Sequence, residues 1–336
     1  MLRDYAHEIL RSNPGSTVLL QVELETHEFE RLYICLKACK RGFQEGCRPI
    51  IGLDGYFLKC YYGDQLLSVI SQDGNNSFFI IAYAVVEVEC TESWKWFLQN
   101  LIFDVGDPID KKYTFISDMQ KGLDIAIKEV CDGIPHRFCN RHIWANMTKH
   151  AKCNGGELRR AFWNCAKTTT LQRFTQCMNA LRMINQTAVE YLRTIDSSRW
   201  SMSVFDTVCK YDALTSNMCE QFNKELLKVR GKPILTLVER VREYITRKKI
   251  RCQTLLGKYN RFLCPKVQAI LEEHNKNSNG WVPLWVGDPH MSQFEITCSP
   301  FSKCAVDMKA HSCSCRVWDL TGISCKHTIA AMLYNS

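Results

Sequence analysis

The C-terminal end of the chain carries two closely spaced pairs of potential metal ligands. Cys313 and Cys315 are separated by one residue, and Cys325 and His327 repeat that spacing after a gap of nine residues. Three thiolates and one imidazole are the donor set of a closed, tetrahedral structural Zn²⁺ site. The turn sequence LTG at 320–322 lets the two pairs face each other, which four unlinked residues would not explain. The pattern predicts a small module that gains much of its folding free energy from zinc.

Two acidic residues lie where predicted strands would present them. Asp54 is the one carboxylate in the apolar run 50–59, and Asp118 follows a predicted strand over 113–117 and precedes a predicted helix over 119–131. A hydrogen-bonded structural role for Asp54 and a helix-capping role for Asp118 stay open. Carboxylates on neighbouring strands also suit a pair of Mg²⁺ or Mn²⁺ ions, which activate a nucleophile and stabilise the leaving oxygen on phosphorus.

Two further patterns are less specific. Cys139 and His142 have zinc-ligand spacing, with His136 as a third candidate, but two ligands do not make a site and packing beside the acidic residues explains them as well. Glu220 lies on a predicted helix over 214–229, and its own neighbourhood does not separate a functional acid from a solvated one.

The most basic stretch of the chain is a predicted helix over 235–256. The candidates for phosphate contacts are Arg247, Lys248, Lys249 and Arg251. A solvated helix face is the alternative explanation. The formal net charge of +8 permits a nucleic-acid partner without requiring one.

The composition indicates an ordinary globular protein. The 336 residues are 46% hydrophobic and 23% charged, which is enough apolar material for a large core. The 19 cysteines are odd in number and the N-terminal residues contain no apolar signal core, so we expect reduced thiols in the cytosol or nucleus, some of them bound to metal. The sequence has no run of about 18 apolar residues, so no membrane-spanning helix is expected.

The elements that position these residues follow from hydrophobic periodicity. The predicted strands are 17–25, 50–59, 65–72, 77–89 and 113–117, with a turn at 73–76 and short strands over 281–310. The predicted helices are 2–11, 29–43, 91–105, 119–131, 214–229 and 235–256, and 143–199 is expected to be all helical. Strands and helices alternate along the chain, so the fold class is α/β.

Several stretches, taken in order, resemble a Mutator-like element (MULE) transposase. They are CRPIIGLDGYFLK, DGNNSFFIIAYAVVEVECTESWKWF, FISDMQKGLDIAI, HRFCNRHIWANM and TSNMCEQFN. The Cys-x-Cys and Cys-x-His pairs resemble a SWIM zinc finger, which ends the chain as it does in that family. The resemblance spans roughly Leu2 to Tyr334. It implies an RNase H-like core, a mixed β-sheet with flanking helices, interrupted by an all-helical insertion and followed by a small zinc-finger module.

The resemblance also implies roles for individual residues. The family's Asp-Asp-Glu triad falls on Asp54, Asp118 and Glu220, and its Cys-x-x-His pair falls on Cys139 and His142. The implied activity is DDE-type, Mg²⁺- or Mn²⁺-dependent strand cleavage and transfer on DNA, in the nucleus. The implied partners are DNA and either further copies of this chain or other transposase-derived proteins.

The expected organisation follows the same resemblance. We expect a lead-in at 1–48, the first part of the core at 49–142, a helical insertion at 143–213, completion of the core with the basic helix at 214–274, and a β-rich segment with the finger at 281–336. Because family members usually carry a DNA-binding region before the core, a second hypothesis is a domesticated, non-catalytic nuclear protein that binds DNA and regulates transcription. A third is a zinc-stabilised interaction protein without DNA affinity.

Overall fold

The computed structural model describes residues 1–336 except 24, 26–27, 60–63, 153, 300–301 and 335–336. The chain divides into two compact units, and each unit is assembled from two separate stretches. The first unit comprises Met1–His136 and Ser216–Phe262, and the second comprises Arg137–Thr215 and Leu263–Ser336. None of the helices in the described part of the chain has both the length and the apolar character needed to cross a membrane.

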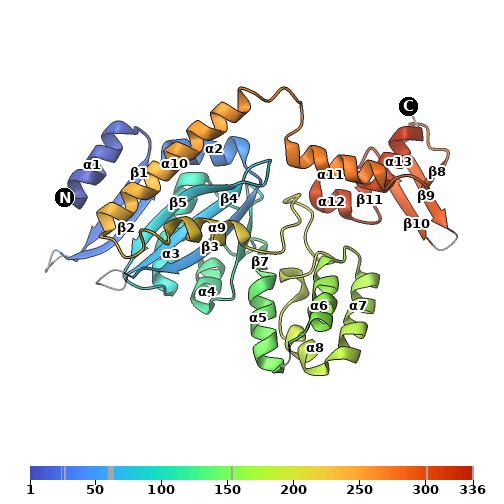
Figure 1. Ribbon diagram of the computed structural model, residues 1–336, viewed down its shortest axis with the longest axis horizontal. Coiled ribbons are helices and arrows are strands. Elements are labelled where there is room, and N and C mark those ends of the chain that lie inside the picture. Colours follow the sequence, from blue (N-terminus) through green and yellow to red (C-terminus); the bar gives the residue numbers. More distant parts are fainter. Residues whose placement is uncertain (24, 26–27, 60–63, 153, 300–301, 335–336) are drawn as a thin grey trace. The chain divides into compact units, whose positions relative to one another are not determined.

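A mixed, seven-stranded sheet organises the first unit (Figure 1). Its strands are β1 (Thr17–Val22), β2 (Phe29–Cys35), β3 (Ile50–Phe57), β4 (Gln65–Gln72), β5 (Phe78–Val86), β6 (Thr114–Ser117) and β7 (His136–Phe138). The spatial order is β1-β2-β5-β4-β3-β6-β7, and the chain passes into the second unit within β7. Strands β1 to β5 pair antiparallel, whereas β6 runs parallel to β3.

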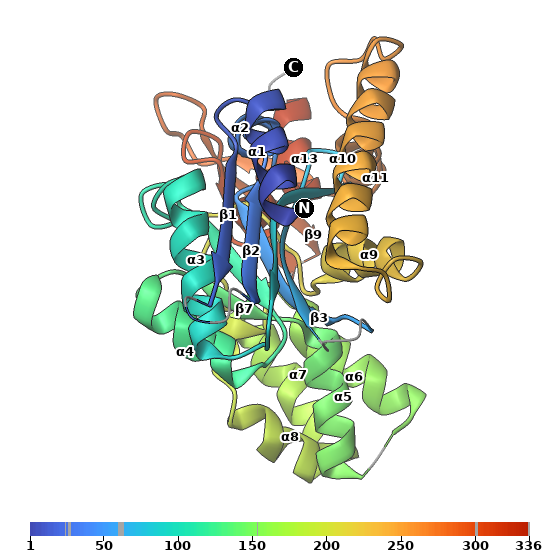
Figure 2. The same cartoon turned by 90° about the vertical axis from the view of Figure 1, so that its left-hand side faces the viewer.

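Helices cover both faces of this sheet (Figure 2). Helices α2 (Lys37–Gly46), α3 (Thr91–Val105) and α4 (Lys121–Val130) pack on one face, where Trp94, Leu53 and Phe115 belong to the main apolar core. Helices α1 (Leu2–Ser12), α9 (Asn217–Leu226) and α10 (Ile234–Leu256) lie on the other face. There the Tyr83 hydroxyl donates to the Val238 carbonyl.

The prediction of one helix over 29–43 is wrong. Residues 29–35 form β2 and only 37–46 form α2. β2 lies between β1 and β5, so Leu32–Cys35 are buried on both sides of the strand. A short, unbroken apolar run is compatible with both a buried strand and a helix, so periodicity alone could not distinguish them. Hydrogen bonding to β1 and β5 on either side makes this segment a strand. The predicted bounds of β4 and α3 are confirmed.

The second unit combines a helical part with a small antiparallel sheet. The helices are α5 (Asn140–Ala151), α6 (Gly156–Lys167), α7 (Leu171–Ile184), α8 (Gln186–Arg193), the 3₁₀ turn η1 (Ser197–Arg199), α11 (Pro265–Lys276), α12 (Val317–Thr321) and α13 (Lys326–Tyr334). The strands β8 (Val282–Trp285), β9 (Gln293–Ser299), β10 (Ser302–Asp307) and β11 (Ser312–Cys313) have the order β11-β10-β9-β8. The expected helical stretch and the expected short strands are therefore present.

Hydrogen bonds join the finger to the helical part of the same unit. The Arg316 guanidinium donates to four backbone carbonyls, those of Thr169, Met202, Ser203 and Phe205. The Thr169 hydroxyl donates to the Cys315 carbonyl at 2.7 Å. Leu320 packs with Met202 and Phe205 in a small buried cluster. The finger is thus a packed part of its unit.

Candidate metal centres

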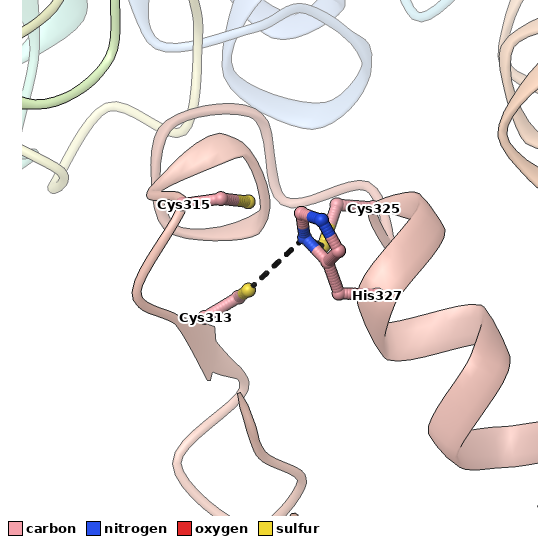
Figure 3. Close-up of side chains that lie close together, drawn as sticks. All are labelled: Cys313, Cys315, Cys325 and His327. Atoms are coloured by element: carbon pink, nitrogen blue, oxygen red, sulfur yellow. Dashed lines mark hydrogen bonds between the residues drawn. The ribbon is translucent and has the colours of Figure 1, made fainter. Parts of the chain in front are cut away.

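The four predicted zinc ligands converge on one point (Figure 3). The ligand atoms of Cys313, Cys315, Cys325 and His327 all lie within 4.8 Å of one another. Nδ1 of His327 is 3.6 Å from Cys313 Sγ and 3.7 Å from Cys325 Sγ. A tetrahedral zinc with bonds of about 2.3 Å to sulfur and 2.0–2.1 Å to nitrogen requires a sulfur–nitrogen separation of about 3.5–3.6 Å. The donor set and its spacing therefore fit a structural Zn²⁺ ion.

Electrostatics at this cluster also suit a cation. Burial alone lowers the pKa of His327, but hydrogen bonding to the thiols of Cys304, Cys315 and Cys325 outweighs burial and raises the pKa to about 11. The sulfurs therefore favour positive charge at the centre of the cluster. This is the environment in which thiolates hold a divalent metal.

Local backbone geometry brings the two ligand pairs together. β11 presents Cys313, whose backbone N–H donates to the Asp319 carboxylate at 3.0 Å. Helix α12 then spans the gap between the pairs and ends at Gly322, whose φ of 68° is a left-handed conformation that suits glycine. Because α13 begins directly after Cys325, His327 lies in its first turn.

The three predicted acids belong to the first unit, on three different elements. Asp54 lies on β3, Asp118 follows β6, and Glu220 lies on α9. In the parallel pairing of β3 with β6, Gly52 is opposite Ile116. Asp54 and Asp118 each follow two residues after that last pair, so both lie beyond the same end of the β3–β6 pairing.

One hydrogen bond ties α9 to the first of these acids. The Asn223 side-chain amide donates to Oδ2 of Asp54 at 2.6 Å. Asn223 lies three residues after Glu220, so the two side chains share one face of the helix. The contact therefore places Glu220 within one helical turn of the residue that holds Asp54. Helical spacing puts Glu220 and Asn223 on one helix face, but nothing local in the sequence indicates the strand partner.

A glycine allows α9 to lie this close to the sheet. A Cβ added at Gly52 would come within 2.6 Å of the Met218 Cε and 2.7 Å of the Cys219 Sγ. Both of these residues lie in the first turn of α9, directly before Glu220. Gly52 and Asp54 are two residues apart and face the same side of the sheet. The glycine therefore sets the distance between the acid on the strand and the acid on the helix.

Asp118 is held by a short network beside the sheet. Its carboxylate accepts from the Gln120 backbone N–H at 3.1 Å, whereas Gln120 itself caps α4. The Ser117 hydroxyl donates to the Asp118 carbonyl and lies 2.9 Å from Nε2 of the buried His136. Nδ1 of His136 is 3.4 Å from Asp124. The capping role considered for Asp118 thus belongs to Gln120, and His136 contacts Ser117 and Asp124.

A fourth carboxylate, which the sequence analysis missed, lies near Asp118. A Cβ at Gly55 would overlap the carboxyl group of Glu89, which follows β5 and accepts from the Trp94 indole at 3.2 Å. Burial, and to a smaller extent the charge of Asp118, raises the pKa of Glu89. The available signal was an acid at the end of the predicted strand 77–89, two residues before the predicted helix 91–105, but carboxylates near a helix N-terminus are too common to stand out.

Comparison with protein families identifies two regions. Residues 50–146 match the MULE transposase domain, and residues 285–335 match the SWIM zinc finger. The chain joins a MULE transposase domain to a SWIM zinc finger. No curated protein matches the chain. The MULE match contains Asp54, Asp118, Cys139 and His142, whereas Glu220 lies beyond it. The SWIM match contains all four converging ligands, which supports structural zinc.

The remaining candidate ligands do not form a tight cluster. Among the described residues, groups of at least three Cys, His, Asp or Glu side chains within 4.8 Å of one another are limited to the finger. Asp54, Asp118 and Glu220 therefore do not meet that distance criterion. Cys139 is the buried residue directly before α5 and His142 lies in the first turn of that helix.

The basic residues of α10 differ in what they contact. The Lys248 ammonium donates to the Phe78 carbonyl and lies 3.3 Å from the centroid of the Phe78 ring. Burial lowers the pKa of Lys248, which identifies it as a packing residue. Arg247, Lys249 and Arg251 are exposed. These three side chains are free of the Phe78 contact, and phosphate binding by the basic residues of α10 stays a prediction.

Proposed function

We propose that this transposase-derived chain carries out DDE-type, metal-dependent strand cleavage and transfer on DNA through Asp54, Asp118 and Glu220. The single observation that carries the proposal is the Asn223–Asp54 hydrogen bond, one helical turn from Glu220. It links Asp54, inside the MULE match, to the helix that carries Glu220, which lies 166 residues later in the chain. The mixed sheet, flanked by helices on both faces, supports an RNase H-like core for this unit.

The three side chains suit hard divalent cations. Carboxylate oxygens are the ligands that Mg²⁺ and Mn²⁺ prefer, and all three acids are partly exposed, so an ion can reach them from solvent. When bound, such ions supply an activated water or 3′-hydroxyl and stabilise charge on phosphorus. Asn223 orients the Asp54 carboxylate, and the Gln120 N–H orients that of Asp118. The protein's part is positioning and charge stabilisation at the phosphate.

A groove between α9 and α10 supports a role for this unit in DNA binding. Four basic side chains line it, Lys228, Lys232, Arg240 and Arg247, together with the acidic Glu225 and Glu243. The excess of cations suits the negatively charged phosphates of the DNA backbone, and such contacts carry no sequence information. We therefore propose DNA backbone contacts along α10 and nuclear localisation. The protein partners remain further copies of this chain or other transposase-derived proteins.

Replacing Arg247 and Lys249 by Glu tests these contacts. We expect weaker DNA binding on all sequences alike and a smaller dependence of affinity on salt, because phosphate neutralisation releases counterions. Lys276→Glu combined with Lys309→Glu, two exposed lysines of the other unit, is the matched charge control. Fluorescence anisotropy with two unrelated duplexes measures both quantities. Unchanged affinity would remove α10 from the DNA path.

A nicking assay tests the proposed chemistry. The full chain is incubated with labelled duplex DNA and either Mg²⁺ or Mn²⁺, alongside Asp54→Asn, Asp118→Asn and Glu220→Gln. We expect metal-dependent strand breaks that each substitution reduces to background. Asp132→Asn, an exposed acid of the first unit outside the candidate site and the groove, is the control and should retain activity. DNA binding without nicking in either metal would overturn the catalytic proposal and favour a domesticated DNA-binding regulator.

A further inference from the structure

Sulfur atoms face both ring nitrogens of His327, and the thiols of Cys304 and the ligand Cys313 also lie within hydrogen-bonding reach of each other. Nδ1 faces Cys313 and Cys325, at 3.6 and 3.7 Å. The other ring nitrogen, Nε2, faces Cys304 Sγ at 3.7 Å. Cys304 lies outside the group of four ligand atoms that are mutually within 4.8 Å, and the Cys-x-Cys, Cys-x-His pattern does not include it. This cysteine therefore needs a different explanation from that of the ligands.

The two nitrogens of an imidazole point away from each other in the ring plane. An ion bound at one nitrogen cannot share a sulfur that contacts the other. When one nitrogen binds a metal, the second carries a proton and donates it to an acceptor that fixes the ring. The separation between Nε2 and the Cys304 sulfur falls within the range of an N–H···S hydrogen bond.

We infer that His327 binds zinc through Nδ1 and donates its Nε2–H to the sulfur of Cys304. Cys304 is then a positioning residue of the finger: it selects the tautomer and the orientation of the ring without touching the ion. Metal-bound histidines usually donate to a carboxylate, a carbonyl or water. Here the acceptor is a cysteine sulfur.

The surroundings of both residues support this arrangement. Trp281 packs edge-to-face against the imidazole, with ring centroids 4.3 Å apart. Cys304 is held in β10, and the next residue, Ala305, exchanges hydrogen bonds of 2.8 and 3.0 Å with Ser314, which lies between two ligands. The sulfur of Cys304 is therefore fixed relative to the loop that carries Cys313.

Cys304→Ala tests the inference in the full chain. Zinc content should stay at one ion per chain, and zinc affinity in competition with a chelator should fall by about 10- to 100-fold, as for other partners of metal-bound histidines. Cobalt(II) bound to the variant should keep the thiolate-to-metal absorption of three sulfurs. Cys298→Ala, which removes an exposed cysteine on the neighbouring strand β9, should change neither quantity.

Three results would overturn the inference. Loss of about a third of the thiolate-to-cobalt absorption in Cys304→Ala would make Cys304 a ligand. A zinc affinity of Cys304→Ala within twofold of the parent's would show that Cys304 has no role in zinc binding. Nitrogen-15 NMR of the zinc-loaded parent chain reports directly which histidine nitrogen is metal-bound, and it does not depend on the variant folding. Metal at Nε2 of His327 would refute the assignment.

Discussion

Two candidate metal centres of this chain are encoded in opposite ways. Fourteen residues separate Cys313 from His327, whereas 166 separate Asp54 from Glu220. The zinc ligands come from one strand end, one turn and one helix start, so local spacing already brings them together. The acids come from β3, β6 and α9 and depend on sheet register and helix packing. Short sequence spacing determines the zinc site, whereas the tertiary fold determines the acidic site.

Removing one thiolate should have the largest effect, confined to the locally encoded site. Cys325→Ser should reduce zinc content to near zero and unfold the finger, because a structural zinc contributes on the order of 10–16 kcal/mol to such modules. Metal analysis and limited proteolysis of the chain measure both, with Cys298→Ser as the control. The first unit has its own core, so most helical signal should persist. One tightly held zinc in the variant would show that the ligand set is wrong.

Moving α9 should affect only the site encoded by the fold. Gly52→Ala places a methyl group against Met218 and Cys219, and overpacking of this kind costs about 1–3 kcal/mol. We expect a lower midpoint of chemical denaturation for the first unit, weaker metal-dependent nicking and unchanged zinc content. Gly46→Ala, where a Cβ meets nothing within 4 Å, is the matched control. Nicking at the parental rate would show that activity does not depend on the distance between α9 and the sheet.

The smallest expected effect is electrostatic, at Glu89. Its pKa is raised in the folded chain, so its ionisation destabilises the native state as pH rises through the folded value. Glu89→Gln should therefore stabilise the first unit at neutral pH when divalent ions are chelated. The gain should disappear below about pH 4, where Glu is protonated in both states. Denaturation curves at pH 4 and pH 7 measure it. Equal stabilisation at both pH values would mean that charge at Glu89 is not the cause.

Features that depend on local spacing could be predicted from the sequence, whereas features that depend on contacts between distant residues could not. The zinc ligands and the bounds of β4 and α3 were predictable because spacing and periodicity are local. Helix 29–43 failed because a strand buried on both faces has no period of two. The sequence analysis grouped Lys248 with the phosphate-binding candidates because its contact with Phe78, 170 residues away, cannot be seen in the local sequence. The Asn223–Asp54 bond and the approach of Glu89 to Gly55 are likewise contacts between distant residues.

The interleaving of the two units has a consequence for synthesis on the ribosome. Residues 1–136 emerge first but lack α9 and α10, which cover one face of their sheet. The helices α5–α8 of the second unit are synthesised next. Arg316, which donates to four carbonyls of this part of the chain, is synthesised more than a hundred residues later. Neither unit can therefore finish folding in chain order. Both cores therefore stay incomplete until residues 216–262 and 263–336 have been synthesised.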